Sequence, residues 1–427
     1  MGPSSDLGKI FRSARHALDL TQGEVGQAVG YSASAISRIE RNKMRVDLET
    51  RLCLARVLHI PPERVSGFPA PTHPVIATVV SEPMPNEEDV MRRRTLLGAL
   101  AAGASTVAVG TGTAQAQPAA GLNLDDMLFR LPDAEPVPLR VVASGTAAAR
   151  EMFTAARYSD LQGALPALLS AAEATRDAAT GRARQQASAV LARAYVLAAE
   201  LAAKQHSDTA WVAADRALAA ARASGMPIPI GEASRVLAIT MRRSGRCSYA
   251  VRLLTHEAGQ LDPAEARTGA VRTSLLLTAA YSAAAGGDRT TALALLDEAD
   301  ETLERHPQAP GGLFTVDATR VQAAVYRIGV HTTLGTPDEG VQIAQDLDIN
   351  LMPTAERRAR AWTDTARMWH ALGNGPQTFA ALRRVEQEAA QEVRRPALRA
   401  LTSNLLYGPA RVPGLREFAL RTGAVPA

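Results

Sequence analysis

Four glycines recur at nearly regular intervals in this 427-residue sequence, and each separates two Ala-rich amphipathic segments. They are Gly245, Gly287, Gly335 and Gly373, at spacings of 42, 48 and 38 residues. Helix, tight turn and helix alternating at such a period are typical of stacked helical hairpins. Each hairpin can bury its apolar face only against its neighbours, so we expect a curved solenoid of several units.

The pattern predicts this solenoid over residues 143–424. The paired helices are expected at 182–204 with 208–224, 230–244 with 247–261, 265–285 with 289–305, 313–334 with 338–347, and 355–372 with 376–393. A less regular pair occupies 144–176, and two short helices between Arg395 and Thr422 form a cap. Six to seven units are therefore expected.

Local residues of these hairpins resemble the tetratricopeptide repeat. Tyr281, Gly287-Asp288 and Ala292-Leu293 fit one such hairpin, and Gly373-Asn374 with Phe379 echoes it. A globular all-α bundle is the alternative fold.

Residues 5–66 carry the signals of five short helices. Thr21 and Glu24 form a capping box at the start of the second helix. Ser32 caps the third helix. A fourth helix follows, and a fifth begins at Pro61, a favourable first-turn residue.

The segment Leu20–Lys43 resembles the helix-turn-helix of the Cro/cI (phage-repressor, or XRE) family. It has the L-T-Q-x-E entry, the turn glycine and the I-S-x-I-E exit of that family. Gly26 departs from it, because alanine is usual there; the glycine costs about 1 kcal/mol of helix propensity without changing the fold. A Cro/cI-type head with a tetratricopeptide-like body resembles regulators of the actinomycete type. It resembles, more distantly, the peptide-sensing repressor–tetratricopeptide family of Gram-positive bacteria. That resemblance implies a dimer through the repeats and a peptide in their concave face, with a small molecule or a protein partner as alternative ligands.

The resemblance implies where DNA is bound. The third helix would enter the major groove, and Arg38 is the one outward side chain with the reach and the fork geometry to read a guanine. Gln22 and nearby backbone N–H groups would hold a phosphate. Basic residues after the third helix would clamp further phosphates. The predicted DNA contacts are Thr21, Gln22, Ser32, Ala33, Ser34, Ser37, Arg38, Arg41, Asn42 and Lys43.

The charge distribution agrees with a polyanion-binding head. Residues 1–69 contain ten Lys/Arg and seven Asp/Glu, so that three of the four net positive charges of the chain lie in this part. The remainder is nearly neutral. A nucleic-acid-binding module joined to a nearly neutral body gives this asymmetry.

Residues 67–142 are predicted to be a linker, because five prolines between 69 and 85 exclude a helix. Within it, residues 92–116 carry an Arg triplet and an Ala/Gly-rich apolar run that resembles a twin-arginine export signal. Such signals start a chain, whereas this run follows the head. It is also a poor membrane span, because Leu, Ile and Phe are few. A flexible linker is favoured over a membrane tether and over a helix packed on the solenoid.

No catalytic motif is recognised. HExxH, GxSxG and GxxxxGK[ST] are absent, and the eight His residues are scattered. Cys53 and Cys247 are too few and too far apart in sequence for a zinc or disulfide framework. We expect no enzyme activity, cofactor or metal. A basic cluster at 357–360 is read as a solvated face, with a carboxylate ligand as the alternative.

The sequence thus predicts an all-α protein with a five-helix head (5–66), a linker (67–142) and an α-solenoid (143–424). The favoured function is a cytoplasmic, nucleoid-associated, homodimeric regulator that binds double-stranded DNA and senses a ligand in the solenoid. The alternative is an interaction scaffold, localised to DNA by the head or to the membrane by residues 92–116.

Overall fold

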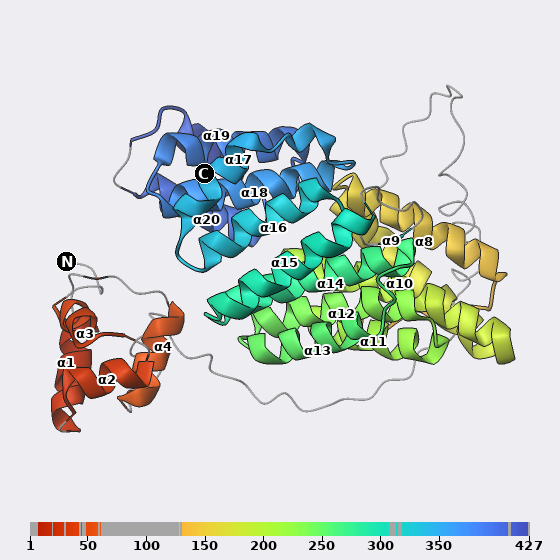
Figure 1. Cartoon of the computed structure of the whole chain (residues 1–427), viewed down its shortest axis with the longest axis horizontal. Helices are drawn as coiled ribbons and strands as arrows, with labels where there is room; N and C mark the ends of the chain where they lie inside the picture. Colours follow the sequence, from red (N-terminus) through yellow and green to blue (C-terminus); the bar gives the residue numbers. More distant parts are fainter. Residues whose placement is uncertain are drawn as a thin grey trace, which may run out of the picture. The chain divides into compact units, whose positions relative to one another are not determined.

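The chain is all-helical in a computed structural model that describes residues 7–18, 20–29, 31–41, 44, 48–58, 60, 128, 130–306, 313, 314, 318–408 and 411–425. Within these residues every regular element is a helix, as the sequence predicts (Figure 1). The chain divides into two compact units, Met1–Asn86 and Glu87–Ala427.

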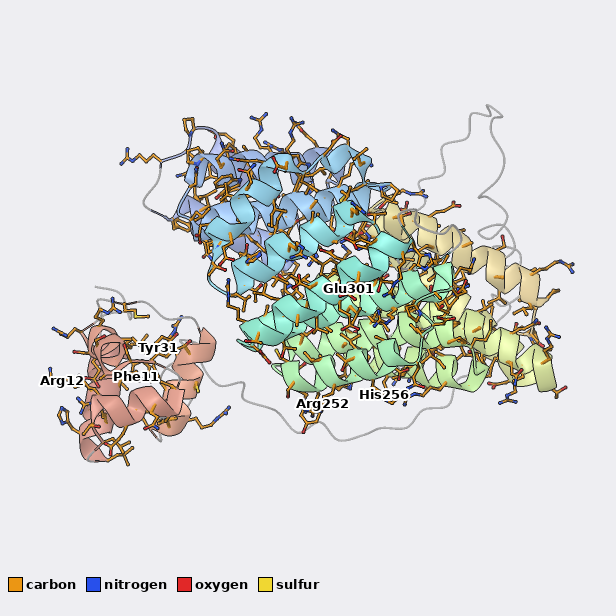
Figure 2. The ribbon with its side chains drawn as sticks, in the orientation of Figure 1. Phe11, Arg12, Tyr31, Arg252, His256 and Glu301 are labelled. Atoms are coloured by element: carbon orange, nitrogen blue, oxygen red, sulfur yellow. The ribbon has the colours of Figure 1, made fainter. Side chains whose placement is uncertain are left out.

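The first unit is a small bundle. Its described helices are α1 (Leu7–Ala17), α2 (Gln22–Val29), α3 (Ala33–Glu40) and α4 (Leu48–Val57). Their apolar faces form a core of Phe11, Val25, Ile36, Ile39, Leu54, Ala55, Leu58 and Ile60. Phe11 points into this core and Arg12 points away from it (Figure 2). The fifth helix, predicted from Pro61, lies outside the described residues.

The second unit consists of helical hairpins in series. They are α8 (Leu139–Thr154) with α9 (Tyr158–Ala178), α10 (Gly181–Gln205) with α11 (Thr209–Ser224), α12 (Pro227–Arg243) with α13 (Cys247–Gly259), α14 (Ala266–Ala285) with α15 (Arg289–Arg305), α16 (Arg320–Thr333) with α17 (Val341–Asp346), α18 (Ala355–Ala371) with α19 (Gly375–Glu388), and α20 (Pro396–Leu406) with α21 (Leu415–Arg421). Short 3₁₀ turns, η2 (Pro337–Gly340) and η3 (Ile349–Leu351), flank α17. The prediction of stacked hairpins is confirmed.

The periodic glycines lie where the hairpins turn. Their φ angles are 72° at Gly245, 79° at Gly287, 78° at Gly335 and 73° at Gly373. This left-handed backbone lets the chain leave one helix and start the next, and it is strained for residues that carry a Cβ. The backbone of the hairpin turns therefore requires glycine at these four positions.

Three predicted helix boundaries are wrong. The helix expected at 313 begins at Arg320, because the Thr319 hydroxyl accepts from the backbone of Gln322 and caps it there. The helix expected to reach 393 ends at Glu388, where the chain turns extended. The first helix begins at Leu139, inside the predicted linker, directly after Pro138 at its N-cap position.

The first helices of successive hairpins form an inner layer. These inner helices are α8, α10, α12, α14, α16 and α18, and each contacts the next. Helix α18 also contacts α8, so the sixth hairpin lies beside the first (Figure 1). The array thus closes on itself within one turn of its superhelix.

A buried charge cluster joins the two ends of this closed array. The Nζ of Lys204, on α10, lies 2.7 Å from Oε1 of Glu356 on α18 and also pairs with Glu392, between α19 and α20. The Tyr158 hydroxyl of α9 donates to the same Glu392, and Arg395 pairs with its second carboxylate oxygen. Because Glu392 is fully buried, these partners replace its hydration.

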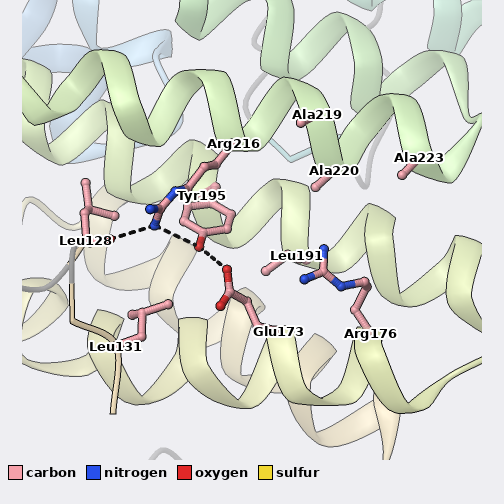
Figure 3. A pocket seen from close by; sticks show the side chains of 10 residues that line it. All are labelled: Leu128, Leu131, Glu173, Arg176, Leu191, Tyr195, Arg216, Ala219, Ala220 and Ala223. Carbon is pink, nitrogen blue, oxygen red and sulfur yellow. Dashed lines mark hydrogen bonds between the residues drawn. The ribbon is translucent and has the colours of Figure 1, made fainter. Parts of the chain in front are cut away.

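A groove of about 510 Å³ lies over α9, α10 and α11 (Figure 3). The Arg216 guanidinium donates to the Leu128 carbonyl oxygen at 2.7 Å and lies 3.5 Å from the Tyr195 hydroxyl, which donates to Glu173. Leu128 is buried in the same place. The chain that precedes α8 therefore packs on the solenoid and fills one end of the groove.

No helix among the described residues has both the length and the apolar composition to cross a bilayer. Residues 92–116, for which a membrane tether was the alternative, lie outside the described residues.

Replacement of Lys204 by methionine should strongly destabilise the second unit. The change keeps the length of the side chain but leaves two buried carboxylates without their shared cation, which costs about 3–5 kcal/mol of unfolding free energy. Urea unfolding followed by circular dichroism measures this loss. The control is Arg305→Met, an exposed position at the end of α15, which should change stability by less than about 0.5 kcal/mol.

The loss caused by Lys204→Met should shrink in acid. Burial opposes the charged forms of Glu356 and Glu392, yet Lys204 and adjacent arginines hold the pKa of both below the ordinary value. The resulting stabilisation exists above the unfolded-state pKa of about 4.3 and is lost as the pH falls below it. Urea unfolding at several pH values from 7 to 3 should show the two proteins converging; a constant difference would contradict the assignment.

Candidate nucleic-acid interface

Helix α2 starts at the predicted capping box. The Thr21 backbone N–H and hydroxyl donate to Glu24 Oε2 at 2.7 and 2.8 Å, and the Glu24 N–H donates to the Thr21 hydroxyl at 3.2 Å. These hydrogen bonds lower the pKa of the Glu24 carboxyl. The start of α2 is thus fixed by a reciprocal cap at its first turn.

Gly26 lies where the turn between α2 and α3 packs against α2. A Cβ at this position would lie 2.3 Å from the Tyr31 carbonyl oxygen, and the Tyr31 N–H donates to the Gly26 oxygen at 2.7 Å. The departure from the family pattern therefore has a local reason: the backbone of the turn occupies the space of an alanine methyl.

Helix α3 presents one apolar and one polar face. Ser32 caps it, because its hydroxyl accepts from the Ala35 N–H at 3.2 Å. Ile36 and Ile39 are buried in the core of the first unit. The residues predicted to face DNA lie on the other side: Ala33, Ser34 and Arg38 are exposed and Ser37 is partly exposed.

The two arginines of this face differ in their contacts. Arg41 donates from Nη2 to the Ser37 hydroxyl at 2.6 Å and from Nε to the Ser37 carbonyl at 3.1 Å. Arg38 has no hydrogen-bond or ion-pair partner among the described residues. Its guanidinium is thus free for a ligand, whereas Arg41 is held beside the helix. The other predicted clamps, Asn42 and Lys43, lie outside the described residues.

Gln22 has a partner within the protein. Its amide donates from Nε2 to Glu40 Oε2 at 2.7 Å, which links the start of α2 to the end of α3. Glu40 also receives two hydrogen bonds from Arg15 of α1, from Nε at 2.6 Å and from Nη2 at 3.1 Å. Burial opposes the charge of Glu40, but Arg15 and Gln22 outweigh it and hold the pKa of Glu40 below its usual value.

Arg15 and Glu40 are positioning residues that the sequence reading missed. Both lie on inward faces, since Arg15 follows Phe11 by four residues and Glu40 follows Ile36 by four. A charged residue in phase with a core stripe indicates a buried partner of opposite charge. The sequence therefore contains a signal, this periodicity, from which an ion pair between Arg15 and Glu40 can be predicted.

The described residues contain no group of three His, Cys, Asp or Glu side chains that could hold a metal ion. Cys53 and Cys247 are both unpaired thiols.

The comparisons with known proteins bear on the first unit. Residues 6–66 match a family profile described as a helix-turn-helix domain. No curated protein matches the chain. Among solved structures, the crystal structure of Bacillus thuringiensis PlcR in complex with the peptide PapR7 and DNA matches over 88% of this chain and 99% of that chain, with 12% identity and a TM-score of 0.34. The chain carries a helix-turn-helix domain, the kind with which transcriptional regulators bind DNA.

Substitution of Glu40 by glutamine should loosen the helix-turn-helix without replacing any residue on the exposed face of α3. Arg15 would remain buried without a counter-charge, which costs about 3–5 kcal/mol. We expect faster amide hydrogen exchange in peptides from α1 to α3 of the full-length protein. Glu24→Gln is the matched control, because glutamine also completes a capping box; equal protection in both variants would argue against the positioning role.

Proposed function

We propose that this protein is a sequence-specific transcriptional regulator of the Cro/cI type found in actinomycetes, acting on double-stranded DNA in the cytoplasm. The observation that carries the proposal is the exposed face of α3, where Ala33, Ser34 and Ser37 surround Arg38. A helix with such short side chains can lie deep in the major groove, which is about 12 Å wide, and an unpaired arginine can read guanine O6 and N7.

The remaining predicted contacts divide between phosphate binding and support. The N–H groups at the start of α2, with Thr21 and Gln22, face one phosphate, while Ser32 and Arg41 flank the recognition helix. Asn42 and Lys43 add phosphate contacts in this proposal. The Gln22 side chain is shared with Glu40, so it acts mainly by fixing the angle between α2 and α3.

We further propose a homodimer whose two heads bind half-sites about one helical turn apart, or 34–36 Å. The second unit would hold the dimer and sense a peptide, a small molecule or a protein partner. Its closed array supports the sensing role, because a ligand among the inner helices can favour one arrangement of hairpins over another. In this reading the protein catalyses no reaction.

Arg38→Ala should remove specific recognition. Loss of its contact to a base should cost about 1–3 kcal/mol at one operator position and relax specificity there. Genome-wide DNA occupancy of the full-length protein should give discrete peaks with a two-fold motif, and the variant should lose them.

Arg252→Ala is the control, because Arg252 is an exposed arginine of α13 (Figure 2). Its occupancy should equal that of the wild type. Peaks that persist in Arg38→Ala would refute the recognition role. The absence of peaks in the wild type would favour the scaffold function, in which the repeats bind a protein partner.

A further inference from the structure

A cavity of about 300 Å³ lies among the inner helices of the second unit. Each inner helix contributes at least one side chain to its wall, and the start of α20 borders it. Pockets for small organic ligands span about 300–1,000 Å³. The closed array therefore has room for one small molecule.

Positive charge exceeds negative charge in this wall. Eight Lys or Arg side chains line the cavity, against three carboxylates. Each of the three carboxylates is shared by two cations: Glu200 by Arg150 and Arg235, Glu356 by Lys204 and Arg357, and Asp364 by Arg360 and Arg367. The carboxylates of the protein thus neutralise only part of the positive charge.

Arg242, on α12, has no carboxylate partner among the described residues. Its guanidinium lies over the Tyr281 ring, 4.5 Å from the ring centroid, and its Nη1 is 3.5 Å from the Ser282 hydroxyl. Burial lowers the pKa of Arg242. A partly buried guanidinium without a counter-ion is unfavourable, so an anionic ligand beside it would be stabilised.

Two buried polar atoms of the same wall also lack hydrogen-bond partners in the described part of the chain. They are Nε of Arg235 on α12 and Oε1 of Gln322 on α16, in side chains that are 5% and 3% exposed. Arg235 and Arg242 are seven residues apart, hence on one face of α12. Buried atoms of this kind usually meet an ordered water or a ligand.

The Tyr326 hydroxyl, in the same wall, lies in a positive electrostatic potential. Burial would raise its pKa, but Arg235, a hydrogen bond with Thr278, and then Arg357 and Arg360 outweigh burial and lower the pKa. A partly buried phenol is shifted in this direction only where cations dominate its surroundings.

We propose that this cavity binds a small molecule with at least two negative charges, carried by phosphate or carboxylate groups, between Arg235, Arg242 and Arg360. Guanidinium forks bind both groups in bidentate geometry. The size of the cavity favours a small molecule over a peptide or a protein. This inference rests on the proposed function in one respect, that the ligand is the signal to which the regulator responds.

The test uses two probes, inorganic pyrophosphate and citrate, with sodium chloride at matched ionic strength as the baseline. Full-length wild-type protein should show a saturable rise in Tm with at least one probe, and calorimetry should give its Kd. Arg242→Gln should weaken that binding about tenfold or more, because it removes a charge-assisted contact. Arg252→Gln, on the exposed face of α13, should bind as the wild type does.

The unliganded stability of Arg242→Gln separates binding from folding. Arg242 has no carboxylate partner among the described residues, so its replacement breaks no ion pair. This variant should therefore be as stable as the wild type or more stable. A response to pyrophosphate alone assigns phosphate chemistry, and a response to citrate alone assigns carboxylate chemistry. No response above salt, or equal responses in wild type and Arg242→Gln, would overturn the proposal.

Operator affinity with and without the bound probe distinguishes this inference from the proposed function. Binding that leaves operator affinity unchanged supports the anion site and counts against the sensing role. If the protein binds its operator but neither probe, the proposed regulatory function is retained and the proposed anion site is refuted.

Discussion

One partly buried ammonium links the two ends of the closed second unit. Lys204 lies between two carboxylates that follow it by 152 and 188 residues, and it joins α10 to α18 and to the segment before α20. It is one of only three lysines in a chain with 47 basic residues. A compact ammonium can donate in three directions and thus serve Glu356 and Glu392 together, whereas a planar guanidinium pairs best with one carboxylate edge.

Closure of the array changes the environment of the side chains on the inner helices. In an open solenoid, the arginines of α12 and α18 would line a wide groove and be hydrated. In the closed array they line a small cavity, so their charges must be balanced by the protein or by a ligand. Arg360 and Arg367 share Asp364, while Arg242 has only an aromatic ring and a hydroxyl. The geometry that completes the fold thus also creates the unbalanced charge in its centre.

The helices and turns were predictable because their signals are local. Thr21 with Glu24, Ser32, and the glycines at the hairpin turns are each recognised within a few residues, and the structure confirms them. The closure was not predictable, because it depends on pairs far apart in sequence whose members resemble ordinary surface charges. The cluster at 357–360 is an example, because its sequence pattern predicts a solvated face. In the structure, Arg358 pairs with Glu388, whereas Arg357 and Arg360 line the cavity.

The same kind of interaction recurs in the first unit, where Arg15 and Glu40 are buried between α1 and α3. A buried ion pair adds little net stability over apolar residues of similar size, since desolvation offsets much of the attraction. It does, however, tolerate very few geometries, because a small displacement leaves a charge unpaired. In each unit the pair lies at a junction between helices: α3 against α1 in the first unit, and the two ends of the array in the second. Fixing those positions, more than adding stability, accounts for charges buried at these junctions.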